Sequence, residues 1–133
     1  MKPRTPPEPP IADRVTAWAQ MQNGSSRWAG HCYRYVRDAF HAAGLSLPMA
    51  PSAADAARWY RARGQMKSDG APPRGAVIFY DNKTTARGHV GISLGSGAIV
   101  HAIGSVVVSN NYRSLPGGAN LTLIGYVTAP LGS

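Results

Sequence analysis

The chain has 133 residues, which is enough for one domain with a hydrophobic core and too few for two. Its hydrophobic fraction of 44% excludes a disordered protein, and no apolar run reaches the length of a membrane span. Lys and Arg number 14 against 6 Asp and Glu, and the resulting net charge of +8 favours anionic surroundings such as nucleic acid, an acidic cell envelope or an acidic polymer.

The N-terminal stretch predicts a tether followed by a helix. Prolines at positions 3, 6, 7, 9 and 10 favour an extended, disordered tether over residues 1–10, which leaves 11–133 as a single domain. Residues 11–21 predict a first helix that buries Val15 and Trp18. A loop at Asn23-Gly24-Ser25-Ser26 follows it.

The single cysteine lies at the start of a second predicted helix, which Gly44 ends. Helical spacing places apolar residues on one side, namely Cys32, Val36, Ala39, Phe40 and Ala43. The opposite side carries Arg34, Arg37, Asp38 and His41. Because Cys32 lies in the first turn, the positive end of the helix dipole is expected to favour its thiolate form.

The second half of the chain predicts strands. A third helix begins with Ser52-Ala53-Ala54-Asp55, a capping-box-like start, and runs to about Arg63, where Gly64 closes it. Strands are expected at 75–80, 105–109 and 121–128, with a loop at Pro116-Gly117-Gly118. Helices precede antiparallel strands, so the predicted class is α+β, with the helices packed on one face of a five- to six-stranded sheet.

Two histidines lie in a β-hairpin that is predicted between the strand at 75–80 and the strand at 105–109. Positions 90, 92 and 94 are apolar, whereas positions 89, 91 and 93 are His, Gly and Ser. A two-residue loop would pair Gly91 with Ala102 and put the two histidines on opposite faces.

A three-residue loop at Gly95-Ser96-Gly97 instead pairs Leu94 with Ala98 and Gly91 with His101. His89 and His101 then share one face, and the other face is uniformly apolar. We favour this register because a slip of one residue would mix the two faces.

A helix-borne cysteine and a sheet-borne histidine are the two parts of a Cys–His catalytic pair. The helix end and an adjacent imidazole would lower the pKa of the thiol, and the thiolate would attack a carbonyl. His101 could hold His89 in the required tautomer, and the backbone N–H of Cys32 could stabilise an oxyanion. Taken singly, each residue is more readily a structural thiol or histidine, but the three together indicate a site.

The residues also resemble a known family, the NlpC-type cell-wall cysteine peptidases, with the CHAP amidases as close cousins. The resemblance covers roughly residues 29–102. It rests on a cysteine on a helix, then Pro-Arg-Gly-Ala-Val-Ile-Phe-Tyr, Gly-His-Val-Gly-Ile and Gly-Ser-Gly-Ala-Ile-Val-His-Ala. It implies a papain-like fold in which Cys32 is the nucleophile, His89 the base and His101 the third member of the triad.

The resemblance further implies hydrolysis of amide bonds in peptidoglycan stem peptides, with no metal or organic cofactor, by a secreted or envelope-located monomer. The family often has Asp-Cys-Ser-Gly at the nucleophile, where this chain has His31-Cys32-Tyr33-Arg34. A tyrosine often precedes the cysteine by about a dozen residues, where this chain has Gln20.

Four residues near the triad are the candidates for holding substrate: Trp28, His31, Tyr33 and Gly88. For His31 two interpretations stay open, because it could tune the thiol or contact substrate, or simply face solvent at the helix start. Trp28 and Tyr33 are expected to line the cleft or to pack around it.

Three other functions compete with peptidoglycan hydrolysis. The same fold could pass its thioester to an amine, as a transamidase or toxin domain acting on protein amide groups. The basic charge could mark a nucleic-acid-binding module, but the sequence has no helix-turn-helix, zinc-finger or RNA-recognition signature, so no nucleic-acid partner is expected. A Cys–His–His zinc site is also conceivable.

Overall fold

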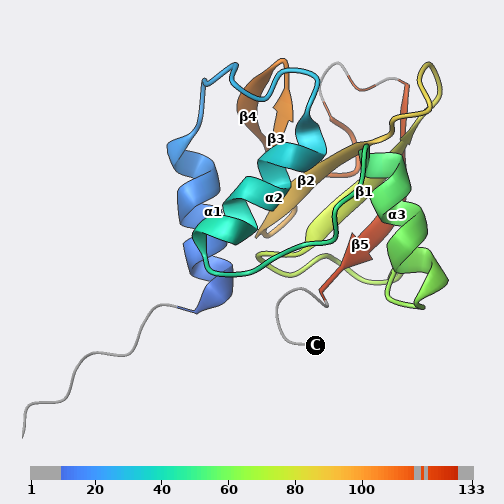
Figure 1. Cartoon of the computed structure of the whole chain (residues 1–133), viewed down its shortest axis with the longest axis horizontal. Helices are drawn as coiled ribbons and strands as arrows, with labels where there is room; N and C mark the ends of the chain where they lie inside the picture. Colours follow the sequence, from blue (N-terminus) through green and yellow to red (C-terminus); the bar gives the residue numbers. More distant parts are fainter. Residues whose placement is uncertain (1–9, 116–117, 119, 129–133) are drawn as a thin grey trace, which may run out of the picture.

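A computed structural model describes residues 10–115, 118 and 120–128, and Figure 1 shows their arrangement. The helices are α1 (Ile11–Met21), α2 (Cys32–Ala42) and α3 (Ala53–Ala62). The strands are β1 (Val77–Asn82), β2 (His89–Gly95), β3 (Ala98–Ile103), β4 (Ser105–Ser109) and β5 (Leu121–Val127). Nine of the ten residues of the expected tether, and Pro116-Gly117 of the expected loop, lie outside the described residues.

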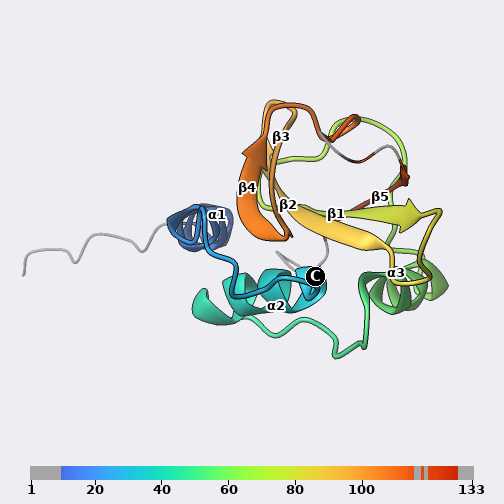
Figure 2. The ribbon, with the colours of Figure 1, turned by 90° about the horizontal axis from the view of Figure 1, so that it is seen from above.

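The strands form one antiparallel sheet in the order β4-β3-β2-β1-β5. Figure 2 shows the helices on one side of this sheet, where α2 packs on β2 and β3 and α3 packs on β1. The predicted α+β class, with helices first and an antiparallel sheet after them, is therefore confirmed, and the described residues supply five strands.

Helix α2 forms because its apolar residues fall on one side, and that side enters the core between the helices and the sheet. Val36, Ala39 and Phe40 are fully buried, as the helical spacing predicts. The prediction missed Tyr33 and Tyr35, which are buried as well. The Tyr35 hydroxyl donates a 2.7 Å hydrogen bond to the Ala19 carbonyl, so it also links α2 to α1.

The hairpin has the predicted pairing along its length but a different turn. Ile92 pairs with Val100, which is the predicted register. The turn holds two residues, Ser96 and Gly97, both at positive φ, and Gly95 pairs with Ala98. An irregularity between Ser93 and Gly95 adds one residue to β2, and this offset restores the register that a two-residue turn alone would have shifted.

The register separates the two faces of the sheet. Val90, Ile92, Val100 and Ala102 join the core beneath the helices, as expected. Since side chains alternate along a strand, His89 and His101 lie on the opposite face. There they neighbour a second apolar cluster, of which the buried members are Ile78, Tyr80, Ile99, Tyr112 and Leu115.

Loop segments bond to both outer strands of the sheet. At β4, the Gly24 N–H donates to the Val106 carbonyl and the Val106 N–H donates to the Ser25 carbonyl. At β5, Lys67 and Tyr126 exchange the equivalent pair of backbone bonds. These contacts hold the connection after α1 and the connection after α3 against the sheet.

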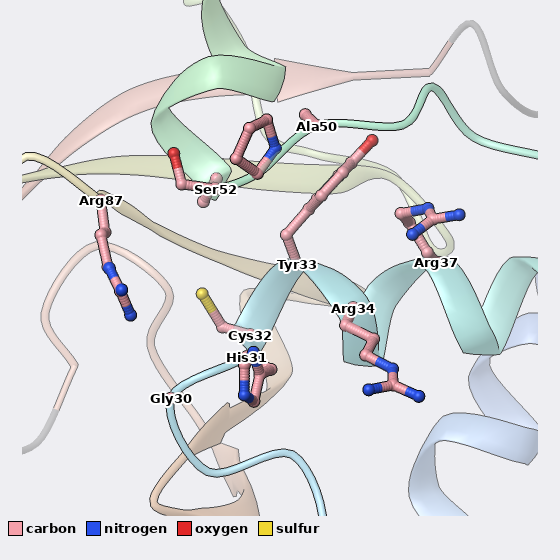
Figure 3. Close-up of a pocket in the computed structure, with 11 residues that line it drawn as sticks. Gly30, His31, Cys32, Tyr33, Arg34, Arg37, Ala50, Ser52 and Arg87 are labelled. Carbon is pink, nitrogen blue, oxygen red and sulfur yellow. The ribbon is translucent and has the colours of Figure 1, made fainter.

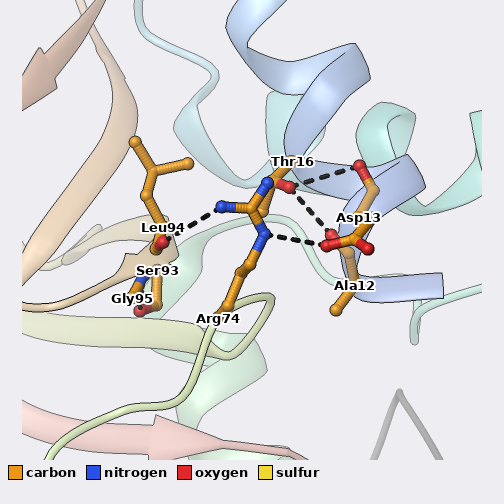
Figure 4. A network of polar contacts seen from close by, with 7 residues as sticks. All are labelled: Ala12, Asp13, Thr16, Arg74, Ser93, Leu94 and Gly95. Carbon is orange, nitrogen blue, oxygen red and sulfur yellow. Dashed lines mark hydrogen bonds and ion pairs between the residues drawn. The ribbon is translucent and has the colours of Figure 1, made fainter. Parts of the chain in front are cut away.

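Arg74 connects the first helix to the hairpin (Figure 4). Its Nε lies 3.0 Å from the Asp13 carboxylate on α1, and a guanidinium N–H donates to the Leu94 carbonyl at 3.4 Å. The buried hydroxyl of Thr16 donates back to the Ala12 carbonyl at 2.9 Å, so it is satisfied within α1.

Candidate active site

Cys32 is the first residue of α2 and is half-buried against the core. The thiol accepts backbone hydrogen bonds from the N–H groups of Cys32 and Tyr33, which have no carbonyl partner because they open the helix. It accepts a third from Val90, the residue after His89 on β2. The fold thus brings the sulfur to the strand that carries the first histidine.

Burial has the larger effect on this thiol. It raises the pKa of Cys32 above its ordinary value, and the three backbone N–H groups lower the pKa by less than burial raises it. The expectation that the helix start yields a resting thiolate is therefore wrong for the protein without substrate. The helix N–H groups act in the predicted direction, but loss of water around the sulfur outweighs them.

The two histidines of the hairpin are in direct contact. His89 Nε2 lies 2.8 Å from His101 Nδ1, and His101 Nε2 lies 3.2 Å from the hydroxyl oxygen of Ser109 on β4. Both rings are buried, His89 to 7% and His101 to 1% exposure. The predicted placement on one face is confirmed, and Ser109 is a third polar member that the sequence interpretation missed.

Both histidines are poor bases in this setting. Burial, with a smaller contribution from the neighbouring His101, lowers the pKa of His89 to about 4. Burial likewise lowers the pKa of His101 to about 4. At neutral pH the site therefore combines a neutral thiol with two neutral imidazoles.

The stability of the protein is expected to depend on this pair. In the unfolded chain a histidine takes up a proton below about pH 6.5, whereas in the folded protein these two stay neutral until about pH 4. The unfolding free energy should therefore fall as pH drops from 6.5 toward 4, by about 1.4 kcal/mol per pH unit for each histidine. Urea unfolding at pH 7 and pH 5 measures this, and the double variant His89→Gln/His101→Gln should lose most of the difference. An equal difference in both proteins would contradict the assignment.

A pocket of about 250 Å³ opens beside Cys32. Its wall comes from the start of α2, the segment before α3 and Arg87, and includes His31 and Tyr33. Figure 3 shows the Cys32 sulfur directed toward the side on which Ser52 and Arg87 lie.

The four candidate substrate residues occupy different places. Tyr33 lines the pocket and is buried, with its hydroxyl donating a 2.6 Å hydrogen bond to the Pro48 carbonyl. His31 lines the pocket and is exposed, which leaves both interpretations of it open. Trp28 is only 3% exposed and does not line the pocket; its indole N–H donates to Asp38 at 2.8 Å.

Gly88 is not in the pocket wall either, although it precedes His89 directly. It adopts a φ of +70°, and a Cβ on it would lie 3.0 Å from the Tyr80 carbonyl oxygen and 3.1 Å from the Ala54 nitrogen. Its role in the described structure is a close backbone approach between β1 and α3, which only glycine allows without strain. Trp28 and Gly88 thus have structural roles in the described residues, and substrate contact by them stays a prediction.

No three His, Cys, Asp or Glu side chains among residues 10–115, 118 and 120–128 lie close enough to form a metal site. Within the same ranges, none of the helices combines the length and the apolar character that crossing a bilayer requires.

Fold and site together define an α+β domain of the papain-like type, with a cysteine at a helix start and a histidine pair on the adjoining sheet. The family model described as the NlpC/P60 family matches residues 21–120, and the chain belongs to this family. The resemblance expected from the sequence is thus confirmed. No curated protein matches the chain.

Solved structures agree with this assignment. An NlpC/P60 family protein from Bacillus cereus matches with a TM-score of 0.67 and 19% identity, over 94% of this chain and 41% of that protein. The peptidoglycan hydrolase RipB from Mycobacterium tuberculosis matches with a TM-score of 0.60 and 23% identity, over 92% of this chain and 66% of RipB. A chain of the type VI effector–immunity complex Tae3–Tai3 from Ralstonia pickettii matches with a TM-score of 0.58 and 25% identity, over 86% of this chain and 96% of that chain. The chain therefore spans less than two thirds of the length of the first two of these proteins.

Proposed function

We propose that the protein is a cysteine peptidase or amidase that hydrolyses amide bonds in the stem peptides of bacterial peptidoglycan. The observation that carries the proposal is the contact of the Cys32 sulfur with the backbone of β2 beside a buried, hydrogen-bonded histidine pair. Membership of the NlpC/P60 family and the likeness to a peptidoglycan hydrolase support it.

The histidine contacts favour one set of tautomers for catalysis. His89 donates from Nε2 to His101 Nδ1, and His101 donates from Nε2 to the Ser109 oxygen. This arrangement leaves Nδ1 of His89 without a proton, so that it can accept one. His89 is then the base, and His101 is the third member that orients it.

The reaction then proceeds from neutral partners. As the Cys32 sulfur attacks the amide carbonyl carbon, its proton passes to Nδ1 of His89. The carbonyl oxygen becomes an oxyanion near the N–H groups at the start of α2. His89 returns the proton to the departing amine, which leaves a thioester on Cys32. Water, deprotonated by His89, then hydrolyses the thioester and frees a carboxylic acid. No metal or organic cofactor takes part in this scheme.

The substrate and the place of action follow from the same proposal. Peptidoglycan peptides carry carboxylates, and a protein with a net charge of +8 is attracted to such a polymer. The protein would act in the cell envelope or outside the cell, as a monomer, with His31 and Tyr33 touching substrate from the pocket wall.

The test uses the single cysteine of the sequence. Purified peptidoglycan is incubated either with the untreated protein or with protein that iodoacetamide has alkylated on Cys32. The masses of the soluble products are then measured by mass spectrometry. The untreated protein should release peptides that have each gained one water and a new amine end. Absence of release, or equal release by the alkylated protein, would overturn the proposal.

A second candidate is a toxin or transamidase of the same fold, which the match to a chain of an effector–immunity complex favours. Here the thioester on Cys32 would pass to an amine instead of water. Incubation with glutamine-containing proteins and a primary amine distinguishes the two, because transamidation replaces ammonia with the amine and shifts the protein mass. Lack of any amine adduct would remove this candidate.

A further inference from the structure

A row of three polar side chains crosses the sheet face that carries the histidines. His89 lies on β2, His101 on β3 and Ser109 at the end of β4, so the row spans three neighbouring strands. Ser109 pairs with Ile99, two residues from His101, and this register puts its hydroxyl on the same face as both rings. Ser109 is only 6% exposed and both rings are buried. Water therefore competes little for the hydrogen bonds of this row.

Gly91 makes room for the middle of the row. A Cβ at Gly91 would lie 2.9 Å from the Cβ of His101 and 2.6 Å from the Cδ1 of Ile99. The missing side chain leaves this space to β3, and Nδ1 of His101 lies 2.8 Å from Nε2 of His89. The other ring nitrogen of His101 lies 3.2 Å from the Ser109 oxygen. His101 is therefore held at both nitrogens.

Two arrangements of protons satisfy these contacts, because a neutral imidazole has one N–H and one unprotonated nitrogen. In the first, Nε2 of His89 donates to His101, and Nε2 of His101 donates to the Ser109 oxygen. In the second, the Ser109 hydroxyl donates to Nε2 of His101, and Nδ1 of His101 donates to Nε2 of His89. Only the first leaves Nδ1 of His89 without a proton, so only the first has a base for the thiol of Cys32.

The Ser109 hydroxyl takes part in both arrangements, but in opposite senses. It accepts in the first and donates in the second, since a hydroxyl can do either. Without the Ser109 oxygen, a proton on Nε2 of His101 would be buried and would lose its acceptor. A buried N–H without an acceptor is rarer in proteins than a buried acceptor without a donor. Loss of the hydroxyl should therefore shift the histidine pair toward the second arrangement.

From these observations we infer that Ser109 is a positioning residue, whose oxygen accepts the Nε2–H of His101 and thereby keeps Nδ1 of His89 unprotonated. The inference rests on the proposed function and deepens it by assigning the protons of its histidine pair. Ser109 is not in the wall of the pocket beside Cys32, so it acts through His101 and not on substrate. When His89 takes up the thiol proton, its bond to His101 becomes charge-assisted, and the bond from His101 to Ser109 supports it.

The direct test is nuclear magnetic resonance of the ring nitrogens at pH 7. In protein labelled with ¹⁵N on histidine, the ¹⁵N shift of each ring nitrogen reports whether that nitrogen carries a proton. The wild type should show an unprotonated Nδ1 and a protonated Nε2 on His89. In Ser109→Ala the two signals of His89 should move toward the opposite assignment, whereas Ser109→Thr, which keeps the oxygen, should match the wild type.

The kinetic test follows hydrolysis of soluble peptidoglycan fragments. Ser109→Ala should lower kcat by about 5- to 50-fold, the size expected when a buried hydrogen-bonding group loses its partner. KM should change little, because the substituted side chain lies outside the pocket. Ser109→Thr should recover most of kcat.

The matched control is Ser105→Ala, which removes a half-buried hydroxyl from the other end of β4 on the same face. It should keep the wild-type kcat and ring spectrum. If Ser109→Ala does not fold, Ser109→Cys replaces it, because a thiol is a weak acceptor.

Two results would overturn the inference and leave the proposed function standing. One is a protonated Nδ1 on His89 in the active wild type, and the other is an unchanged spectrum and kcat in Ser109→Ala. The expected spectra without hydrolysis by any of these proteins would support the assignment of the protons and refute the hydrolase.

Discussion

Cys32→Ala and His89→Ala are each expected to lower the rate of peptidoglycan hydrolysis by about 10³- to 10⁵-fold. The sulfur supplies the bond-forming atom, and His89 supplies the only described base on β2 beside it. Because the two groups act in one step, the double variant should be no slower than the slower single variant. Release of soluble peptides from purified peptidoglycan, followed over time, measures the three rates.

The control for this experiment is His41→Ala, which removes an exposed histidine from the other end of α2. It should retain the wild-type rate. Circular dichroism shows whether His89→Ala folds, and His89→Gln serves if it does not. Independent losses, in which the double variant is slower than the wild type by the product of the two single factors, would show that the two residues do not work as a pair.

Phe40→Ala is expected to lower the unfolding free energy by about 3–5 kcal/mol. Phe40 is 0% exposed and fills the core between α2 and the sheet, so its removal leaves a cavity in addition to the lost burial. Urea unfolding at neutral pH measures the change. His41→Ala, one position further on the exposed side of the same helix, should change the unfolding free energy by less than about 0.5 kcal/mol. Equal losses in both variants would contradict the packing of α2.

The same substitution also tests how the site is held. Helix α2 carries Cys32 at its first residue, and its buried side is what fixes that residue against β2. In Phe40→Ala the fraction of protein that remains folded should therefore keep some activity, and the loss should grow with temperature as α2 loosens. A constant activity up to the unfolding temperature would show that α2 is positioned by other contacts.

Much of the fold could be predicted from local patterns. The predicted bounds of α1 and β4 match the described ones, because prolines, glycines and apolar spacing mark their ends. The pairing of the two histidines could also be predicted, since only one register keeps the opposite face apolar. The turn has two residues where three were predicted. The register is nevertheless the predicted one, because β2 contains one extra residue at its irregularity.

The properties of the site that depend on tertiary packing could not be predicted. The pKa of Cys32 depends on how much water the folded chain removes from around the sulfur. The extent of this desolvation cannot be predicted from the residues next to Cys32 in the sequence. Trp28 lies near Cys32 in sequence, yet it packs with Trp18 and Tyr35 in an aromatic cluster. Arg34 and Arg37 lie on α2 and Arg87 lies just before β2, so only the folded chain brings these three arginines to one pocket.

The loop segments that bond to β4 and β5 have a consequence for behaviour at high concentration. A free outer strand is a template on which a second molecule can extend the sheet, and this is a common route to aggregation. Here Val106 and Tyr126 already use their outward backbone groups within the molecule. We therefore expect the domain to resist strand-to-strand association, and weakening the segment at Gly24 and Ser25 should promote it.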